Sequence, residues 1–192
     1  LILLGQGVQM EAKKWLSAAL QDLHPHLAVE RTSRDDKTPG PVELACAHAE
    51  YRLVMITKTT PTTLPAAFVQ DLFDDFAPTF DSKLCDTLGY RAPELLMSAL
   101  FGQRSIFGAI LDLGAGTGLL GKLLRPHCAK LEANELSPEM AKLAVEKGCY
   151  DSVQVCDLRK TLEESTEVWD VITACDVFVY VGCLRHVFEA AE

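Results

Sequence analysis

The chain has 192 residues, of which 48% are hydrophobic, and a net charge of −9 at pH 7. This length suits one main hydrophobic core and a small appendage. The acidic balance and the lack of a lysine and arginine cluster disfavour binding to nucleic acid, and no apolar run reaches the roughly 18 residues that a membrane span needs. The odd number of cysteines, seven in total, forms no C-x-x-C pair, so we expect reduced thiols and a cytoplasmic protein.

Residues 1–58 have the pattern of a helical region. Apolar residues recur on one helical face over residues 9–23, and a second helix is expected over 42–57. Residues 30–41 are polar and turn-rich and predict a loop, and 57–65 predict a linker. The stretch EAKKWLSAALQDLHP resembles a tetratricopeptide helix, but about three repeats are normally needed for a stable stack. A protein partner for these helices is therefore a hypothesis.

A glycine-rich turn follows an apolar strand in the run ILDLGAGTGLLG (110–121), where the strand carries one acid, Asp112. The glycines of the turn are Gly114, Gly116 and Gly118. A strand, a glycine turn and a helix start together let the backbone approach a nucleoside ligand closely. Leu119 stands where the dinucleotide pattern G-x-G-x-x-G requires its third glycine. The spacing therefore disfavours a nicotinamide-dependent oxidoreductase.

A second strand is expected over residues 130–135, and it ends in an acid, Glu135. In nucleoside-binding α/β folds, an acid about 20 residues beyond the glycine turn accepts hydrogen bonds from the ribose hydroxyls. The alternative is a solvated glutamate at a strand end. A helix should follow, because Ser137 can cap it, Pro138 fits its first turn and Gly148 can close it.

Two further strands complete the pattern. Residues 152–156 predict a short strand followed by Asp157, which could instead cap the next helix. The largely apolar run 168–181 predicts a buried parallel strand that Asp176 ends. Strands that alternate with helices and carry polar residues at their ends indicate an α/β fold with a doubly wound parallel sheet.

Residues 66–192 resemble a class I S-adenosylmethionine (SAM)-dependent methyltransferase, which implies a Rossmann-like sheet over 106–192 after leading helices over 66–105. The segments 68–96, 147–158 and 174–184 are similar to predicted methyltransferases that carry tetratricopeptide-like helices ahead of the catalytic domain. Only four strands are visible, fewer than the family fold has, so the domain is expected to be truncated at its C-terminus.

The resemblance implies SAM as cofactor and assigns roles to residues of the pattern. Asp112 would bind the amino group of SAM, and Glu135 would bind the ribose. The backbone that contacts the methionine part of SAM would be that of Gly114, Ala115, Gly116 and Gly118. Leu136 and Leu158 would sandwich the adenine, with Asp157 at its amino group. The alternative for both leucines is core packing.

The resemblance also implies positions for the methyl acceptor. Asp176 would lie beside the sulfonium or the acceptor and could take a proton from a hydroxyl or amine. Tyr180 could point into the same pocket, or it could simply cover the sheet. In related small-molecule methyltransferases the region of residues 73–81 forms a lid, and the paired acids Asp74 and Asp75 favour a lid here, although its phenylalanine spacing also suits core packing.

The leading hypothesis is therefore a SAM-dependent methyltransferase that acts on a small-molecule or carrier-bound acceptor. The alternative from a different class is a SAM-binding adaptor with helical N-terminal repeats and little or no turnover. No metal site is expected, because the single C-x-x-H pair, Cys183 and His186, has no second pair at zinc spacing.

Overall fold

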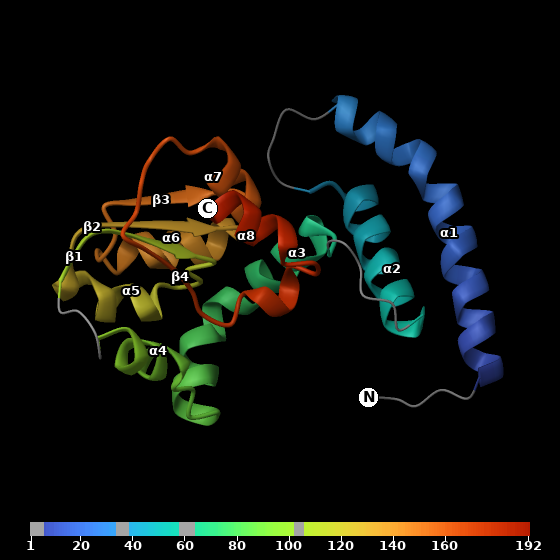
Figure 1. The fold of residues 1–192 in the computed structure, drawn as a ribbon. Coiled ribbons are helices and arrows are strands. Elements are labelled where there is room, and N and C mark those ends of the chain that lie inside the picture. Colours follow the sequence, from blue (N-terminus) through green and yellow to red (C-terminus); the bar gives the residue numbers. More distant parts are fainter. Residues whose placement is uncertain (1–5, 34–38, 58–63, 102–105) are drawn as a thin grey trace. The chain divides into compact units, whose positions relative to one another are not determined.

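The computed structural model describes residues 6–33, 39–57, 64–101 and 106–192 (Figure 1). The chain divides into two compact units, Leu1–Val69 and Gln70–Glu192. The second unit contains the glycine turn and the sheet.

The first unit is built on two helices that pack against each other, α1 (Gln6–Ser33) and α2 (Pro41–Thr57). Their interface buries Leu20 of α1 against Cys46 and Ala49 of α2. The predicted second helix is confirmed to within one residue. The prediction of a loop from residue 30 is wrong, because α1 continues through Ser33.

The extra turn of α1 places polar residues where α2 begins. The Glu30 carboxylate accepts hydrogen bonds from the amides of Val42 (3.2 Å) and Glu43 (2.9 Å), and Arg31 pairs with the Glu43 carboxylate at 2.7 Å. The first amides of a helix lack partners within the helix, so a carboxylate there satisfies them. The polar composition of this segment suggested a loop. In the structure, its charged side chains instead form the contact between α1 and α2.

The second unit holds a parallel sheet in the order β3-β2-β1-β4. Its strands are β1 (Phe107–Leu113), β2 (Cys128–Glu135), β3 (Ser152–Val155) and β4 (Val171–Ala174). The helices and turns between and after the strands are α5 (Leu119–Leu124), η3 (Arg125–His127), α6 (Pro138–Glu146), α7 (Leu158–Glu164), η4 (Phe178–Tyr180) and α8 (Arg185–Ala191). The predicted α/β fold with a parallel sheet is confirmed.

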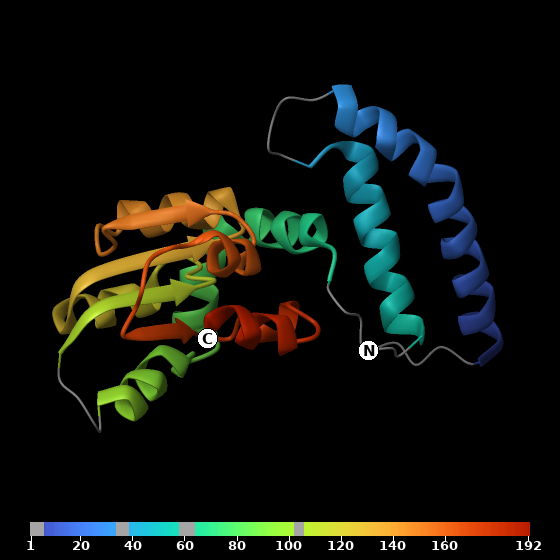
Figure 2. The ribbon, with the colours of Figure 1, turned by 45° about the horizontal axis from the view of Figure 1, so that its top comes forward.

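Alternating side chains of β1 supply the cores on the two faces of the sheet. Ile110 packs into a cluster that includes Leu124 of α5, whereas Leu111 and Leu113 pack into a cluster that includes Leu158 of α7. Helices consequently cover both faces, as Figure 2 shows. Before β1 come α3 (Ala66–Phe76), η1 (Ala77–Thr79), a π-helical turn η2 (Ser82–Thr87) and α4 (Ala92–Phe101).

The fourth strand is shorter than predicted. The run 168–181 was expected to hold a buried strand that Asp176 ends, but β4 covers only Val171–Ala174. Val168 is 87% exposed, and the chain turns at Asp176, whose φ is +58°. The apolar residues beyond that turn, Val177 and Val181 among them, pack on the Leu111 side of the sheet instead of extending it. Their apolar character therefore reflects burial beside the sheet.

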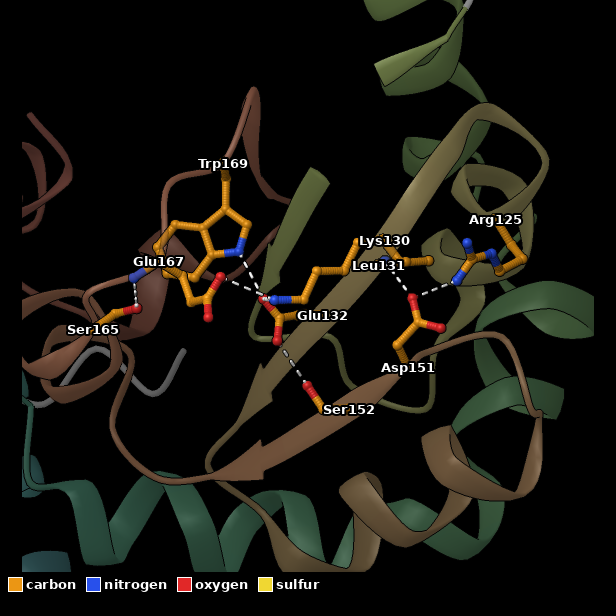
Figure 3. Close-up of polar contacts among 9 residues, drawn as sticks. All are labelled: Arg125, Lys130, Leu131, Glu132, Asp151, Ser152, Ser165, Glu167 and Trp169. Atoms are coloured by element: carbon orange, nitrogen blue, oxygen red, sulfur yellow. Dashed lines mark hydrogen bonds and ion pairs between the residues drawn. The ribbon is translucent and has the colours of Figure 1, made fainter. Parts of the chain in front are cut away.

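A cluster of polar side chains connects β2 with neighbouring segments, at a distance from the glycine turn (Figure 3). Glu132 of β2 accepts hydrogen bonds from Trp169 Nε1 at 3.0 Å and from the Ser152 hydroxyl at 3.1 Å, and it pairs with Lys130 at 3.1 Å. Burial opposes ionisation of Glu132, but these three partners outweigh it and lower its pKa below the ordinary value. The same region holds Asp151, which accepts the Leu131 amide at 2.7 Å.

Candidate functional site

The parallel strands bring the predicted polar residues to one edge of the sheet. The glycine turn follows β1, Glu135 ends β2, Asp157 follows β3 and Asp176 follows β4. From β1, the next two strands along the chain, β2 and β3, lie on one side, and β4 lies on the other side of β1. Open α/β sheets bind ligands at the carboxyl ends of the strands where the order reverses, which here is the crevice between β1 and β4.

A small pocket with a cavity volume of about 50 Å³ lies at this crevice and opens to solvent. Four predicted cofactor residues line it together with residues from the helical segment before β1. The lining consists of Phe80, Tyr90, Pro93, Asp112, Gly114, Ala115, Gly116, Thr117, Leu119, Leu120 and Cys175. The other predicted site residues, from Gly118 to Tyr180, lie outside this lining.

The glycine turn requires glycine for its conformation. Gly114, Gly116 and Gly118 have φ values of +61°, +57° and +86°, which side chains rarely adopt. A Cβ on Gly114 would also lie 2.8 Å from the Cβ of Val177, closer than real side chains approach. The turn therefore brings bare backbone to the pocket wall.

Glu135 anchors the turn. Its Oε2 accepts a hydrogen bond from the Gly116 amide at 2.7 Å and its Oε1 accepts one from the Ser137 amide at 2.8 Å. The residue is 6% exposed, and burial raises the pKa of its carboxyl against the opposing effect of these amides. Glu135 is thus a buried carboxylate at the glycine turn and not the solvated strand-end glutamate of the alternative.

Asp112 is buried beneath the turn, with 1% of its surface exposed. Its two oxygens accept hydrogen bonds from the Tyr150 hydroxyl at 2.7 Å and the Thr173 hydroxyl at 2.9 Å. Burial raises its pKa from 3.8 to about 6, although both hydroxyls favour the ionised form. Sequence reasoning missed Tyr150 and Thr173, because neither belongs to a motif and both reach Asp112 from distant segments.

The predicted adenine residues have evident structural roles. The Asp157 carboxylate accepts the Arg159 amide at 2.9 Å and caps α7, which matches the alternative given for it. Leu158 is 8% exposed and packs with Leu111 and Leu162 in the core. A cofactor role for these two residues and for the half-buried Leu136 stays a prediction.

The two predicted catalytic residues lie beyond β4. Asp176 is exposed, and its positive φ is uncommon for a residue with a side chain; such strain is often found at functional sites. Tyr180 packs edge-on against Phe73, with ring centroids 5.0 Å apart. This contact is with α3 and does not test the alternative that Tyr180 covers the sheet. A catalytic role for either residue stays a prediction.

Tyr90 and Cys175 complete the pocket on the β4 side. The Tyr90 hydroxyl lies 3.4 Å from the Cys175 thiol. Burial, followed by the neighbouring Cys175 and Asp176, raises the pKa of the Tyr90 phenol, so it stays protonated at neutral pH. Sequence reasoning did not identify either residue as part of the pocket.

The segment expected as a lid is hydrogen-bonded to the start of α6. Asp74 accepts hydrogen bonds from the Ser137 hydroxyl and from the Glu139 amide at 3.3 Å, and so it joins Ser137 at the start of α6. The predicted cap by Ser137 is confirmed, because its hydroxyl accepts the Met140 amide at 3.0 Å. Asp74 therefore has a structural partner, and the lid remains a prediction.

Part of the chain is similar to known proteins. Residues 111–192 match the family model of a methyltransferase domain. The parallel sheet, with the glycine turn after β1 and the acid of β2 at its carboxyl edge, has the order of a methyltransferase fold. No curated protein matches the chain.

Two solved structures are similar to part of this chain. An S-adenosylmethionine-dependent methyltransferase from Clostridium acetobutylicum is 25% identical, covering 62% of this chain and 52% of its own, with a TM-score of 0.51. Magnesium protoporphyrin IX methyltransferase from Synechocystis is 18% identical, covering 65% of this chain and 66% of its own, with a TM-score of 0.46. The chain thus spans about half the length of the Clostridium protein. Within the described ranges, no helix has the length and apolar character needed to span a membrane.

Proposed function

We propose that this chain binds SAM at the glycine turn and transfers the methyl group to a small-molecule or carrier-bound acceptor. The observation that carries the proposal is the bond from the Gly116 amide to the buried Glu135 carboxylate. It links the two elements of the nucleoside-binding pattern beside a pocket at the sheet crevice.

The residues that line the pocket fit a cationic cofactor. Among the described residues of the pocket wall, Asp112 is the one charged side chain, and none is basic. SAM carries a positive sulfonium and an amino group, whereas a dinucleotide carries a pyrophosphate that this wall would not neutralise.

In this proposal the chain binds the two ends of the cofactor separately. Asp112 would hold the amino group in its ionised form, and the backbone of the glycine turn would hold the rest of the methionine part. Glu135 would accept hydrogen bonds from the ribose hydroxyls, and the charge of its carboxylate would strengthen these bonds. Leu136, Asp157 and Leu158 would surround the adenine.

The chain's contribution to the reaction would be positioning. SAM supplies a methyl group activated by its sulfonium. Holding an acceptor in line and excluding water can be worth about 7–11 kcal/mol in well-oriented reactions. Asp176 would accept the proton of a hydroxyl or amine acceptor, and Tyr180 would orient it. The α1 and α2 helices would add a surface for a protein partner.

Transfer of label from methyl-labelled SAM tests the catalytic part. The chain and its Glu135→Ala variant are incubated with a pool of free small metabolites and, separately, with carrier-bound acyl groups. We expect label in one pool with the parent chain and much less with the variant. Binding of the product S-adenosylhomocysteine without transfer to either pool would contradict catalysis and favour the adaptor.

A further inference from the structure

Thr117, Asp81 and Lys147 form a closed triangle of polar contacts behind the glycine turn. The Thr117 hydroxyl donates to Asp81 Oδ1 at 2.5 Å, and the Lys147 ammonium donates to Asp81 Oδ2 at 2.7 Å. The same ammonium donates to the Thr117 carbonyl at 2.5 Å. The triangle joins three distant segments: the turn after β1, the segment before η2 and the end of α6.

The surroundings of the triangle distinguish it from an ordinary surface ion pair. Thr117 is 1% exposed and the Lys147 side chain 14%, although that of Asp81 is 44% exposed. Exposed ion pairs contribute little because water screens them, whereas a partly buried, charge-assisted network holds its geometry more firmly. Lys147 also stands at the C-terminus of α6, where a cation is favourable.

The triangle fixes the residue that covers the turn. Asp81 directly follows Phe80, which lines the pocket, and the ring of Phe80 lies 4.0 Å from the position of a Cβ on Gly116. We call residues 80–90 the cover segment. Its far end is held at Tyr90, next to Cys175. Between these ends lies η2, a π-helical turn of the kind that is rare and often occurs at functional sites.

We propose that Lys147 is a positioning residue of the cofactor site. Its ammonium ties Asp81 to the turn, so that Phe80 stays over the glycine backbone and a bound ligand leaves slowly. The inference rests on the proposed function for the identity of the ligand. The arrangement of the cover segment itself does not require a ligand, so it can be measured separately.

Binding of S-adenosylhomocysteine tests the inference with Lys147→Met. Lys142→Met is the matched control, because Lys142 is an exposed lysine of the same helix. We expect the dissociation constant of Lys147→Met to rise about tenfold, mainly through faster dissociation, and Lys147→Arg to recover most of the loss. A purely stabilising lysine would lower the melting temperature and leave the constants of the folded protein unchanged.

Hydrogen exchange without ligand supplies the second readout. We expect amides of residues 80–90 to exchange about tenfold faster in Lys147→Met than in Lys142→Met, with the strands of the sheet unchanged. If Lys147→Met does not fold, Asp81→Asn replaces it, because Asp81 is more exposed. Parent-like exchange in 80–90 overturns the inference, as does parent-like ligand dissociation. Faster exchange together with no binding by the parent chain overturns the proposed function alone.

Discussion

At Gly116 the backbone needs a positive φ, but the space around it is open. A Cβ there would meet only the ring of Phe80, at 4.0 Å. The substitution Gly116→Asp should therefore strain the turn but keep the fold, since aspartate tolerates this conformation better than most residues. It should abolish measurable binding of S-adenosylhomocysteine, because a carboxylate would fill the wall of the pocket close to Glu135. Calorimetric titration measures the loss.

Gly116→Asn serves as the control for Gly116→Asp, because asparagine has nearly the same size without the charge. Binding should be weaker than in the parent chain but stronger than with aspartate. Parent-like affinity in the aspartate variant would show that the ligand does not use this turn.

Asp112 gives the unfolding free energy a pH dependence. Its pKa is about 6 in the folded chain against an ordinary 3.8, so between these values the folded state holds a proton that the unfolded state has released. Stability from this residue consequently falls as pH rises from about 4 to about 6, by about 3 kcal/mol in all. Asp112→Asn removes this contribution.

Urea unfolding of the parent and Asp112→Asn at several pH values measures the effect. The carboxyls with lowered pKa, Glu132 and Asp151, act in the opposite direction at lower pH and cancel in the comparison. The variant should gain stability relative to the parent as pH rises through the window. A difference that does not change with pH would mean that Asp112 titrates normally.

Sequence reasoning identified the residues whose chemistry follows from local pattern. The glycine turn, Asp112 and Glu135 were found because a strand end, a turn and an acid have fixed spacing along the chain. Tyr150 and Lys147 were not found, because their partners lie 38 and 30 residues away and depend on how α6 and β3 pack. Such contacts leave no periodic signal.

Helix α5 offers a test at the scale of one element. An alanine in place of a helical glycine normally stabilises by about 1 kcal/mol. At Gly121, however, a Cβ would lie 2.8 Å from Cε1 of Tyr150 and closer still to its hydroxyl. The ring could yield only by breaking its bond to Asp112. We expect Gly121→Ala to destabilise the chain by about 1–3 kcal/mol, the usual cost of overpacking.

A double-mutant cycle isolates the cause of the Gly121→Ala effect. In a Tyr150→Leu background the shorter side chain leaves room for the methyl group, so Gly121→Ala should become neutral or stabilising. Chemical denaturation of the four proteins gives the coupling energy. An equal cost in both backgrounds would show that Tyr150 is not the obstacle.

The elements themselves were predicted best where a cap or a turn marks their ends. The start of α6 at Ser137 and Pro138 and its close at Gly148 follow from side-chain chemistry, and Gly148 has the expected positive φ of +65°. The extent of β4 was overestimated, because apolar composition alone does not show which apolar residues belong to the strand and which pack beside the sheet. The end of α1 was misjudged because its charges bind the next helix.

At the scale of the molecule, the order β3-β2-β1-β4 places the glycine turn and Asp176 on either side of the crevice. The alternation of strands and helices in the sequence predicted this sheet, because right-handed connections between parallel strands leave few topologies. The cover segment could not be predicted in the same way, since nothing in its sequence shows that its two ends are held by Lys147 and Cys175.

Titration of S-adenosylhomocysteine into the chain, with NADH as the control ligand, tests the cofactor assignment most directly. The acidic wall of the pocket and the spacing of the glycine turn predict micromolar binding of S-adenosylhomocysteine and none of NADH. Binding of NADH alone, or of neither ligand by a chain that is shown to be folded, would contradict the assignment of a SAM site to this pocket.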